Sequence, residues 1–600
     1  MTEPDGTEVD VEEAVVNLLK PSVMTAEQGS TFADRLCAPG PSNSDHAPSG
    51  AQAPSALCSG MTPPSDRPPI SRRTFATLLA STPFALSGLA GATPPLPQPA
   101  EGRGRSGLPH SARQITLLYT NDFHSAFEPV PAFWRPGAPR LGGAAHLASV
   151  IERERAAAGT SFLLDSGDMF TGTLSRLTEG EALLELMLLL RYDAMAVGNH
   201  EFDYGWQAFE RGITRVPFPI LCCNVRYRAS GVRFCRPHTI LERDGVRVGV
   251  IGVMGSLAAS RTIMPSKVAE LEFTDPVAET QASVRALRDT VDVLVVLGHQ
   301  GLPGPMQSDA EADPTVQRPL DEDVGFCGAV PGIDVYIAAH SHHGLEQPLV
   351  HPDTGTVITQ TYGYGTRVGR VRLALDGGRV TGHEVDLLPV ESDRIPAHPA
   401  VTARVAQYRA RVAPEIGPPV GSAAARFTRK YHLESTLGAL CADVMRTRAG
   451  SEVALTNAGG LRADLPEGAI DRGHILDAFP FLNDSVTLDL PGGALWGALE
   501  QGCSLEAGMV QASGIEVRYD PRRPVGSRIL SARIGGVPLD RERRYRVTTN
   551  SFMAEGGDGY RDFRDGKEIR RDPVLSELIA DHFRQKERVD LPGMGRLVAV

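Results

Sequence analysis

Five short hydrophobic runs along the chain each end in a polar segment of similar composition. The runs lie at residues 115–120 (ITLLYT), 161–166 (SFLLDS), 194–197 (AMAV), 291–297 (VDVLVVL) and 334–339 (DVYIAA). Continuous apolar runs of this length are typical of strands buried on both faces of a sheet. The patterns at residues 142–158 and 179–190 predict helices between such strands. The sequence therefore predicts an α/β fold.

The polar residues that follow the runs are of the types that bind metals. They are Asp122, His124, Asp168, Asn199, His299, His340 and His342. Such residues gather beyond the carboxyl ends of the strands in this kind of sheet. Each one alone could instead cap a helix or lie in a turn, but their repeated placement at strand ends favours a shared site. Carboxylate, amide and imidazole ligands suit zinc, manganese, iron or cobalt.

The segment 193–205, DAMAVGNHEFDYG, combines a metal ligand with groups suited to proton transfer. The amide oxygen of Asn199 can bind a metal, the neighbouring His200 can donate a proton, and Asp203 can orient that imidazole. Asp168 can bridge two cations, and two cations can clamp the attacking and leaving oxygens of an in-line displacement. This chemistry requires no serine or cysteine nucleophile.

Length and charge narrow the class of protein. A chain of 600 residues with 42% hydrophobic and 22% charged residues predicts a globular protein of two or more domains. Its formal charge of −12 argues against a nucleic-acid duplex as the main partner, because phosphate contacts need a basic surface. A small anionic substrate held by metal ions remains compatible with that charge.

The N-terminal part differs from the rest. Residues 1–60 predict disorder, and residues 61–92 match an export signal, with the twin-arginine pattern at residues 71–75 (SRRTF). We expect translation to begin at Met61, which would leave residues 1–60 untranslated. The apolar run is shorter than the roughly 20 residues of a spanning helix, so we expect no stable membrane insertion. A linker at residues 93–113 would follow. We therefore expect export to the periplasm, the envelope or the medium, with the twin-arginine translocase as a partner.

Six cysteines follow the signal, and none has CxxC spacing, which argues against a thiolate zinc site. A disulfide between Cys235 and either Cys222 or Cys223 is one possibility, and buried free thiols are the other.

Five motifs, TNDFH, GD, GNHEFD, GHQG and HSH, occur in this order. Together they resemble the calcineurin-like dimetal phosphoesterases, specifically the exported bacterial and ecto 5′-nucleotidase family, from residue 114 to the C-terminus. The resemblance implies a four-layer α/β/β/α metallophosphoesterase domain at residues 114–395. It also implies a linker helix within residues 396–420, where the pattern at 399–412 is helical, and a smaller α/β substrate-binding domain at 421–600.

The same resemblance implies roles for the strand-end residues. One of two divalent metal ions would be held by Asp122, His124 and His342, and the other by Asn199, His299 and His340. Asp168 would bridge them, and a metal-bound hydroxide would attack phosphorus. His200 and Asp203 would form the catalytic pair that stabilises the transition state and the leaving oxygen.

The C-terminal half contains candidate substrate contacts. From the residues alone, Gly460 allows close backbone approach, Arg462 offers a planar fork for an anion, and Phe481 and Phe552 offer faces for stacking. A glycine-rich turn with core phenylalanines is the plainer interpretation. By resemblance, Asn457 and Arg462 match substrate contacts, Phe481 and Phe552 enclose the base, and Asp558 holds the ribose hydroxyls.

One position departs from the family pattern. Tyr431 stands where relatives usually have an arginine, and either Arg429 or Lys430 compensates for it or the phosphate-side contact is altered. The sequence thus predicts an exported 5′-nucleotidase. The alternatives are a 2′,3′-cyclic-nucleotide phosphodiesterase/3′-nucleotidase, a UDP-sugar hydrolase and, more distantly, a thiosulfohydrolase or a non-catalytic nucleotide-binding protein.

Overall fold

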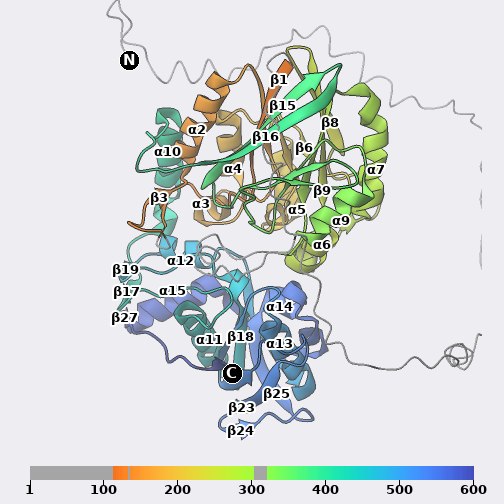
Figure 1. The fold of residues 1–600 in the computed structure, drawn as a ribbon. Helices are drawn as coiled ribbons and strands as arrows, with labels where there is room; N and C mark the ends of the chain where they lie inside the picture. The colour runs from red at the N-terminus through yellow and green to blue at the C-terminus, as the bar shows by residue number, and fades with distance from the viewer. Residues whose placement is uncertain (1–112, 133–134, 303–319) are drawn as a thin grey trace, which may run out of the picture. The chain divides into compact units, whose positions relative to one another are not determined.

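The computed structural model describes residues 113–132, 135–302 and 320–600 (Figure 1). The predictions of an N-terminal extension, an export signal and nearly all of the following linker lie outside the described residues. All of the residues that the sequence singles out for chemistry lie within them.

Two six-stranded sheets form the first half of the described chain, in the orders β16-β15-β1-β4-β5-β6 and β13-β14-β12-β11-β9-β8. The first contains β1 (Arg113–Thr120), β4 (Thr160–Asp165), β5 (Ala194–Ala196), β6 (Ile220–Leu221), β15 (Arg367–Asp376) and β16 (Arg379–Pro389). The second contains β8 (His238–Arg243), β9 (Val246–Met254), β11 (Val293–His299), β12 (Val335–Ala338), β13 (Leu349–Val350) and β14 (Val357–Thr359). The five predicted strands form, but they divide between the sheets: β1, β4 and β5 run parallel in one, and β11 and β12 run parallel in the other.

The sheets pack face to face through a core that draws side chains from both. Tyr119 and Phe162 from the first sheet and Val248 and Val295 from the second belong to this cluster and are almost fully buried. Separate clusters cover the outer faces, where the helices pack. Figure 1 shows α2 and α10 on one side of the sheets and α7 and α9 on the other. This is the α/β/β/α layering that the family resemblance implies.

The helices of this half follow the predicted pattern closely, with α2 at Ala144–Ala157 and α4 at Glu181–Leu189. The others are α3 (Thr173–Leu177), α5 (Trp206–Ile213), α6 (Ser256–Thr262), α7 (Pro276–Leu287) and α9 (Asp321–Ala329), with the 3-10 turns η1 (His200–Phe202), η2 (Pro265–Val268) and η3 (Arg288–Thr290). Two short ribbons pair β2 (Val130–Pro131) with β3 (Arg140–Leu141), and β7 (Val225–Tyr227) with β10 (Leu271–Phe273).

Helix α10 (Pro399–Ile416) connects the two halves and is longer than the pattern at residues 399–412 indicates. It starts with a proline at its first turn, where proline is tolerated because that N–H has no helical partner. Pro414 lies inside its last turn, and the helix ends at Gly417 with a positive φ of 66°.

The second half has a five-stranded sheet in the order β21-β18-β25-β20-β26, with smaller sheets of three and four strands. The five strands are β18 (Val453–Asn457), β20 (Asp484–Pro491), β21 (Val510–Ser513), β25 (Arg544–Asn550) and β26 (Lys567–Val574). The smaller sheets contain β17 (Gly421–Ala423), β19 (Gly468–Ile470) and β27 (Arg588–Val589), and β22 (Ile515–Tyr519), β23 (Ile529–Ile534), β24 (Val537–Pro538) and β28 (Leu597–Ala599). The helices are α11 (Thr436–Ala449), α12 (Arg472–Ala478), α13 (Gly492–Ser504), α14 (Ser551–Ala554) and α15 (Leu575–Lys586), with η4 (Ala458–Gly460), η5 (Gly557–Gly559) and η6 (Arg561–Asp565).

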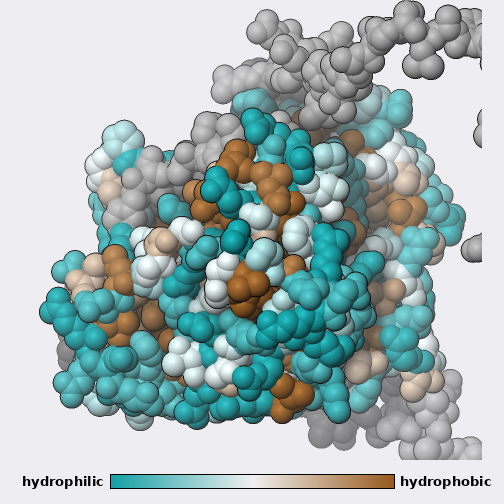
Figure 2. Space-filling model, turned by 90° about the horizontal axis from the view of Figure 1, so that it is seen from below, coloured by the Kyte–Doolittle hydropathy of each residue, from teal (hydrophilic) through white to brown (hydrophobic). Residues whose placement is uncertain are grey.

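Figure 2 shows a face on which hydrophilic residues dominate and hydrophobic residues are spread in several groups. Among the described residues, no helix has both the length and the apolar character needed to span a bilayer. The six described cysteines are buried free thiols, which is the second of the two possibilities that the sequence left open.

Candidate active site

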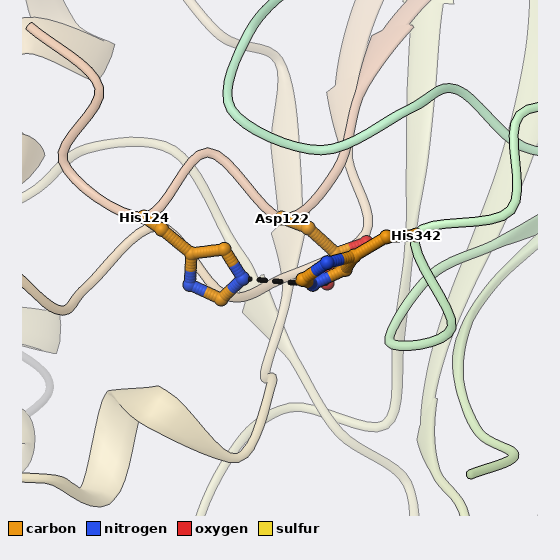
Figure 3. Close-up of side chains that lie close together, drawn as sticks. All are labelled: Asp122, His124 and His342. Atoms are coloured by element: carbon orange, nitrogen blue, oxygen red, sulfur yellow. Dashed lines mark hydrogen bonds and ion pairs between the residues drawn. The ribbon is translucent and has the colours of Figure 1, made fainter. Parts of the chain in front are cut away.

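The first cluster of candidate metal ligands contains residues from the loop after β1 and from the loop after β12 (Figure 3). The Nε2 atoms of His124 and His342 lie 3.0 Å apart, and His342 Nε2 lies 3.6 Å from Asp122 Oδ1. The side chains of His124 and Asp122 are almost completely buried, at 1% and 0% exposure. Three ligand atoms that converge this closely can hold one cation.

A second cluster of candidate ligands lies beside the first, and Asp168 is close to both. His299 Nε2 lies 3.2 Å from Asp168 Oδ2 and 3.0 Å from Asn199 Oδ1, and the rings of His299 and His340 are 5.0 Å apart. Asp168 Oδ2 also lies 4.0 Å from His124 Nε2 in the first cluster. The structure therefore places Asp168 between the two groups, where a bridging ligand would have to lie.

The chemistry of these residues fits a pair of divalent cations. His340 Nε2 is buried and has no hydrogen-bond partner within the described parts of the chain, and such an atom is costly unless a ligand satisfies it. Burial lowers the pKa values of His124 and His340 well below the usual range, so both imidazoles are neutral, as metal ligands must be. Burial opposes ionisation of Asp168, but the charges on His299 and His200 outweigh it and hold its pKa well below the usual range.

Backbone strain is concentrated at these ligands. Asp122, His124, Asp168, His340 and His342 all have positive φ angles, between 47° and 72°. Such angles cost a non-glycine residue about 1–2 kcal/mol, and strained residues of this kind cluster at functional sites. The neighbouring loop needs glycine for a different reason, because a Cβ atom on Gly198 would collide with the Asp168 carboxylate.

His200 lines the pocket and is more exposed than the other histidines of the two clusters. Its side chain is 13% exposed, whereas that of His299 is 0% exposed. Its Nδ1 atom lies 3.1 Å from both carboxylate oxygens of Asp203, and its Nε2 atom lies 3.9 Å from Asp168 Oδ2. Burial opposes the charged imidazole, but Asp203 and Asp168 outweigh it and raise the pKa of His200 above its usual value. This geometry suits a proton donor oriented by Asp203.

Glu201 is a residue whose role the sequence did not reveal. Its buried carboxylate accepts hydrogen bonds from the backbone N–H groups of Asp168 (2.9 Å), Gly198 (2.6 Å) and Met169 (2.9 Å). It therefore ties the loop that carries Asp168 to the loop that carries Asn199. Only its position in the motif GNHEFD, next to His200, hinted at a role.

A pocket runs from this cluster to the second half of the chain. All six predicted substrate contacts line it, together with Asp168, Asn199 and His200: Asn457, Gly460, Arg462, Phe481, Phe552 and Asp558. The Phe481 ring is stacked on the His200 ring with centroids 5.5 Å apart. Asn457 Nδ2 donates to Asp558 Oδ2 at 2.7 Å, and burial raises the pKa of Asp558 to about 7.

Arg462 is the pocket residue best placed to receive an anion. Its Nε and Nη2 atoms are buried without a hydrogen-bond partner among the described residues. Its Nη1 atom donates a long hydrogen bond of 3.5 Å to the Gly459 carbonyl, and its guanidinium lies over the Tyr364 ring, 6.0 Å from the centroid. Tyr431 also lines the pocket, whereas Arg429 and Lys430 do not belong to its wall. Tyr431 itself therefore lies in the pocket wall, and neither Arg429 nor Lys430 supplies a positive charge to that wall.

Comparisons with known proteins agree with the fold. The calcineurin-like phosphoesterase family matches residues 115–344, and the 5′-nucleotidase C-terminal domain matches residues 417–565. The trifunctional nucleotide phosphoesterase YfkN of Bacillus subtilis is 28% identical over 75% of this chain, which spans only 32% of that longer protein. The snake venom 5′-nucleotidase of Naja atra is 27% identical over 81% of this chain and 98% of its own length.

The solved structures include a 5′-nucleotidase precursor from Thermus thermophilus that is 28% identical, with a TM-score of 0.71. That likeness covers 81% of this chain and 99% of the other. Because both domain families match in order, and the relatives and the structure extend across both, the chain belongs to the 5′-nucleotidase family of metal-dependent phosphoesterases.

Proposed function

We propose that this enzyme releases phosphate from nucleoside 5′-monophosphates. The observation that carries the proposal is a single pocket that joins the metal-ligand clusters, the unpaired donors of Arg462 and two phenylalanine rings. A phosphate, a sugar and a base could occupy these three regions in that order. The names of the relatives in the same family point to the same class of substrate.

Two divalent cations would complete the site. Asp122, His124 and His342 would hold one, and Asn199, His299 and His340 the other, with Asp168 shared between them. When bound, such ions supply positive charge to the phosphate oxygens and lower the pKa of a coordinated water. Zinc, manganese, cobalt and iron all suit this set of ligands.

The protein's own side chains would bind the phosphate and handle the proton. In the reaction the phosphorus–O5′ bond breaks, water supplies the new phosphate oxygen, and the departing O5′ atom takes up a proton. Arg462 would donate its unpaired N–H groups to the phosphate. His200 would donate the proton from Nε2, with Asp203 holding the ring through Nδ1.

The nucleoside would lie along the second half of the pocket. Phe481 and Phe552 offer aromatic faces to a base, and each face is worth roughly 0.5–1.5 kcal/mol beyond the area buried. The carboxylate of Asp558, which Asn457 holds in place, would accept hydrogen bonds from the ribose hydroxyls. These residues would position the nucleoside and would not act on the phosphorus, and Phe481 also stacks on the His200 ring.

Phosphate release from several substrates tests the proposal. We expect the metal-loaded protein to release phosphate rapidly from AMP, and more slowly from 3′-AMP, 2′,3′-cyclic AMP and a UDP-sugar. A chelator should abolish the reaction. If no nucleotide is hydrolysed while two metals remain bound, the result would favour the thiosulfohydrolase or nucleotide-binding alternatives and direct attention to Tyr431.

A double substitution separates base binding from chemistry. Phe481→Ala with Phe552→Ala should raise KM for nucleotides while hydrolysis of a simple aryl phosphate is retained. An equal loss on both substrates would contradict the stacking role, because the aryl phosphate has no base to stack.

We also propose export through the twin-arginine pathway, on the strength of the SRRTF pattern at residues 71–75. Replacing Arg72 and Arg73 by lysine preserves the charge but not the pattern. We expect the variant to accumulate inside the cell, as fractionation and activity measurements would detect. Unchanged export of the variant would refute the proposal.

A further inference from the structure

The base end of the pocket has a wall that no sequence motif indicates. Helix α6 and turn η2 follow strand β9 of the metallophosphoesterase half, and Ile263, Met264 and Lys267 from this segment line the pocket together with Phe481 and Phe552. We call residues 256–268 the side wall. Thr262 of the side wall also lines the pocket, so its lining residues are one hydroxyl, two apolar side chains and the positively charged Lys267.

Two contacts fix the side wall against the second half of the chain. Ser266 donates from its backbone N–H (3.0 Å) and its hydroxyl (2.9 Å) to the carboxylate of Glu555. Arg261 forms an ion pair of 3.2 Å with Glu506. Glu555 directly follows helix α14, which carries Phe552. Lys267 directly follows Ser266 in the chain and lines the same pocket as Phe552.

Lys267 has no polar partner among the residues that the structure describes. Within the described parts of the chain, its half-buried side chain makes no hydrogen bond or ion pair, although it lines the pocket. The acidic residues of the pocket lining already contact other side chains: Asp203 contacts His200, Asp558 contacts Asn457, and Asp168 contacts His299. An ammonium group in this position is a donor that a ligand can satisfy.

We propose that Lys267 donates a hydrogen bond to a carbonyl oxygen on the edge of the substrate base, so that the enzyme prefers oxo bases to amino bases. This inference rests on the proposed function. An ammonium group donates and cannot accept, so it pairs with the oxo group of hypoxanthine, guanine or uracil and disfavours the amino group of adenine or cytosine. The phosphate would lie at Arg462 and the metal ligands, which leaves Lys267 for the base.

Hydrolysis of IMP and AMP tests the inference, because at position 6 of the purine IMP carries an oxo group where AMP carries an amino group. For the full metal-loaded protein we expect kcat/KM for IMP to exceed that for AMP by about tenfold, the size expected for one charged hydrogen bond. Lys267→Met should remove this preference, and Lys267→Gln should weaken it. Lys267→Arg, which keeps a charged donor, should retain most of it. UMP and CMP should repeat the pattern.

Lys586→Met is the matched control, since it makes the same charge change at an exposed position outside the pocket wall. It should leave the IMP-to-AMP ratio unchanged. Equal rates for IMP and AMP in the unaltered enzyme, or an equal loss for both in Lys267→Met, would overturn this inference and leave the nucleotidase proposal intact. Absence of hydrolysis of every nucleotide would overturn both.

Discussion

His200 can be tested separately from metal binding. Its side chain is 13% exposed, more than those of the candidate metal ligands His342 (6%) and His299 (0%). We expect His200→Ala to lower kcat by about 10²–10⁴-fold, the usual contribution of a positioned proton donor. Metal analysis of the same sample should still give two ions per chain. Loss of metal in the variant would mean that His200 is a ligand and that the assignment is wrong.

The buried carboxyl group of Asp323 should make the protein less stable as the pH rises. Its Oδ1 atom accepts a hydrogen bond from Tyr336 (2.7 Å), its Oδ2 atom has no partner among the described residues, and burial raises its pKa to about 8. In the unfolded chain the carboxyl ionises near pH 4. Between about pH 4 and pH 8 the unfolded state therefore loses a proton that the folded state keeps, and stability falls as pH rises.

The substitution Asp323→Asn keeps the shape of the neutral carboxyl and removes this titration. We expect the variant and the parent to have similar Tm values near pH 4.5. At pH 8.5 the variant should be the more stable by about 2–4 °C. Tm measured across this range checks the sign, and Asp321→Asn at the exposed start of the same helix is the control. A constant difference at all pH values would contradict a neutral Asp323.

At the scale of elements, Glu201 links two loops that each carry a proposed metal ligand. Its carboxylate accepts hydrogen bonds from the backbone N–H groups of Asp168 and Gly198, and the side-chain amide of a glutamine at this position would turn an NH₂ group toward such donors. We expect Glu201→Gln to weaken metal affinity by about 10–100-fold, as for other residues that support ligands. Titration of the metal-free protein with zinc measures this. Glu270→Gln at an exposed position should bind zinc normally, and equal affinity in the two variants would rule out the linking role.

The strands were predictable because a run buried on both faces has to be apolar throughout, and its end is marked by the first polar residues. Asp122 and His299 were identified in this way. The sequence does not show that β1 and β11 belong to different sheets, because pairing depends on contacts between residues far apart in the chain. Nor does it show that Lys267 lines the pocket, since the side wall has no motif and its place is set by the contact of Ser266 with Glu555.

At the scale of the whole molecule, backbone strain at the two ligand clusters lowers the stability of the fold, and metal binding there would raise it. Five candidate ligand residues have positive φ angles, and His340 Nε2 has no hydrogen-bond partner among the described residues; both features are unfavourable on their own. Metal ions that bind only the folded chain would compensate, by about 2.7 kcal/mol at 100 times the dissociation constant.

We therefore expect a chelator to lower Tm by several degrees and stop phosphate release together, and manganese or zinc to restore both. The variant Asp168→Ala, which lacks the shared carboxylate, should show a low Tm that added metal does not raise. If chelation stopped activity but left the Tm of the unaltered protein unchanged, the strained ligand loops would have to be stabilised by the rest of the fold alone.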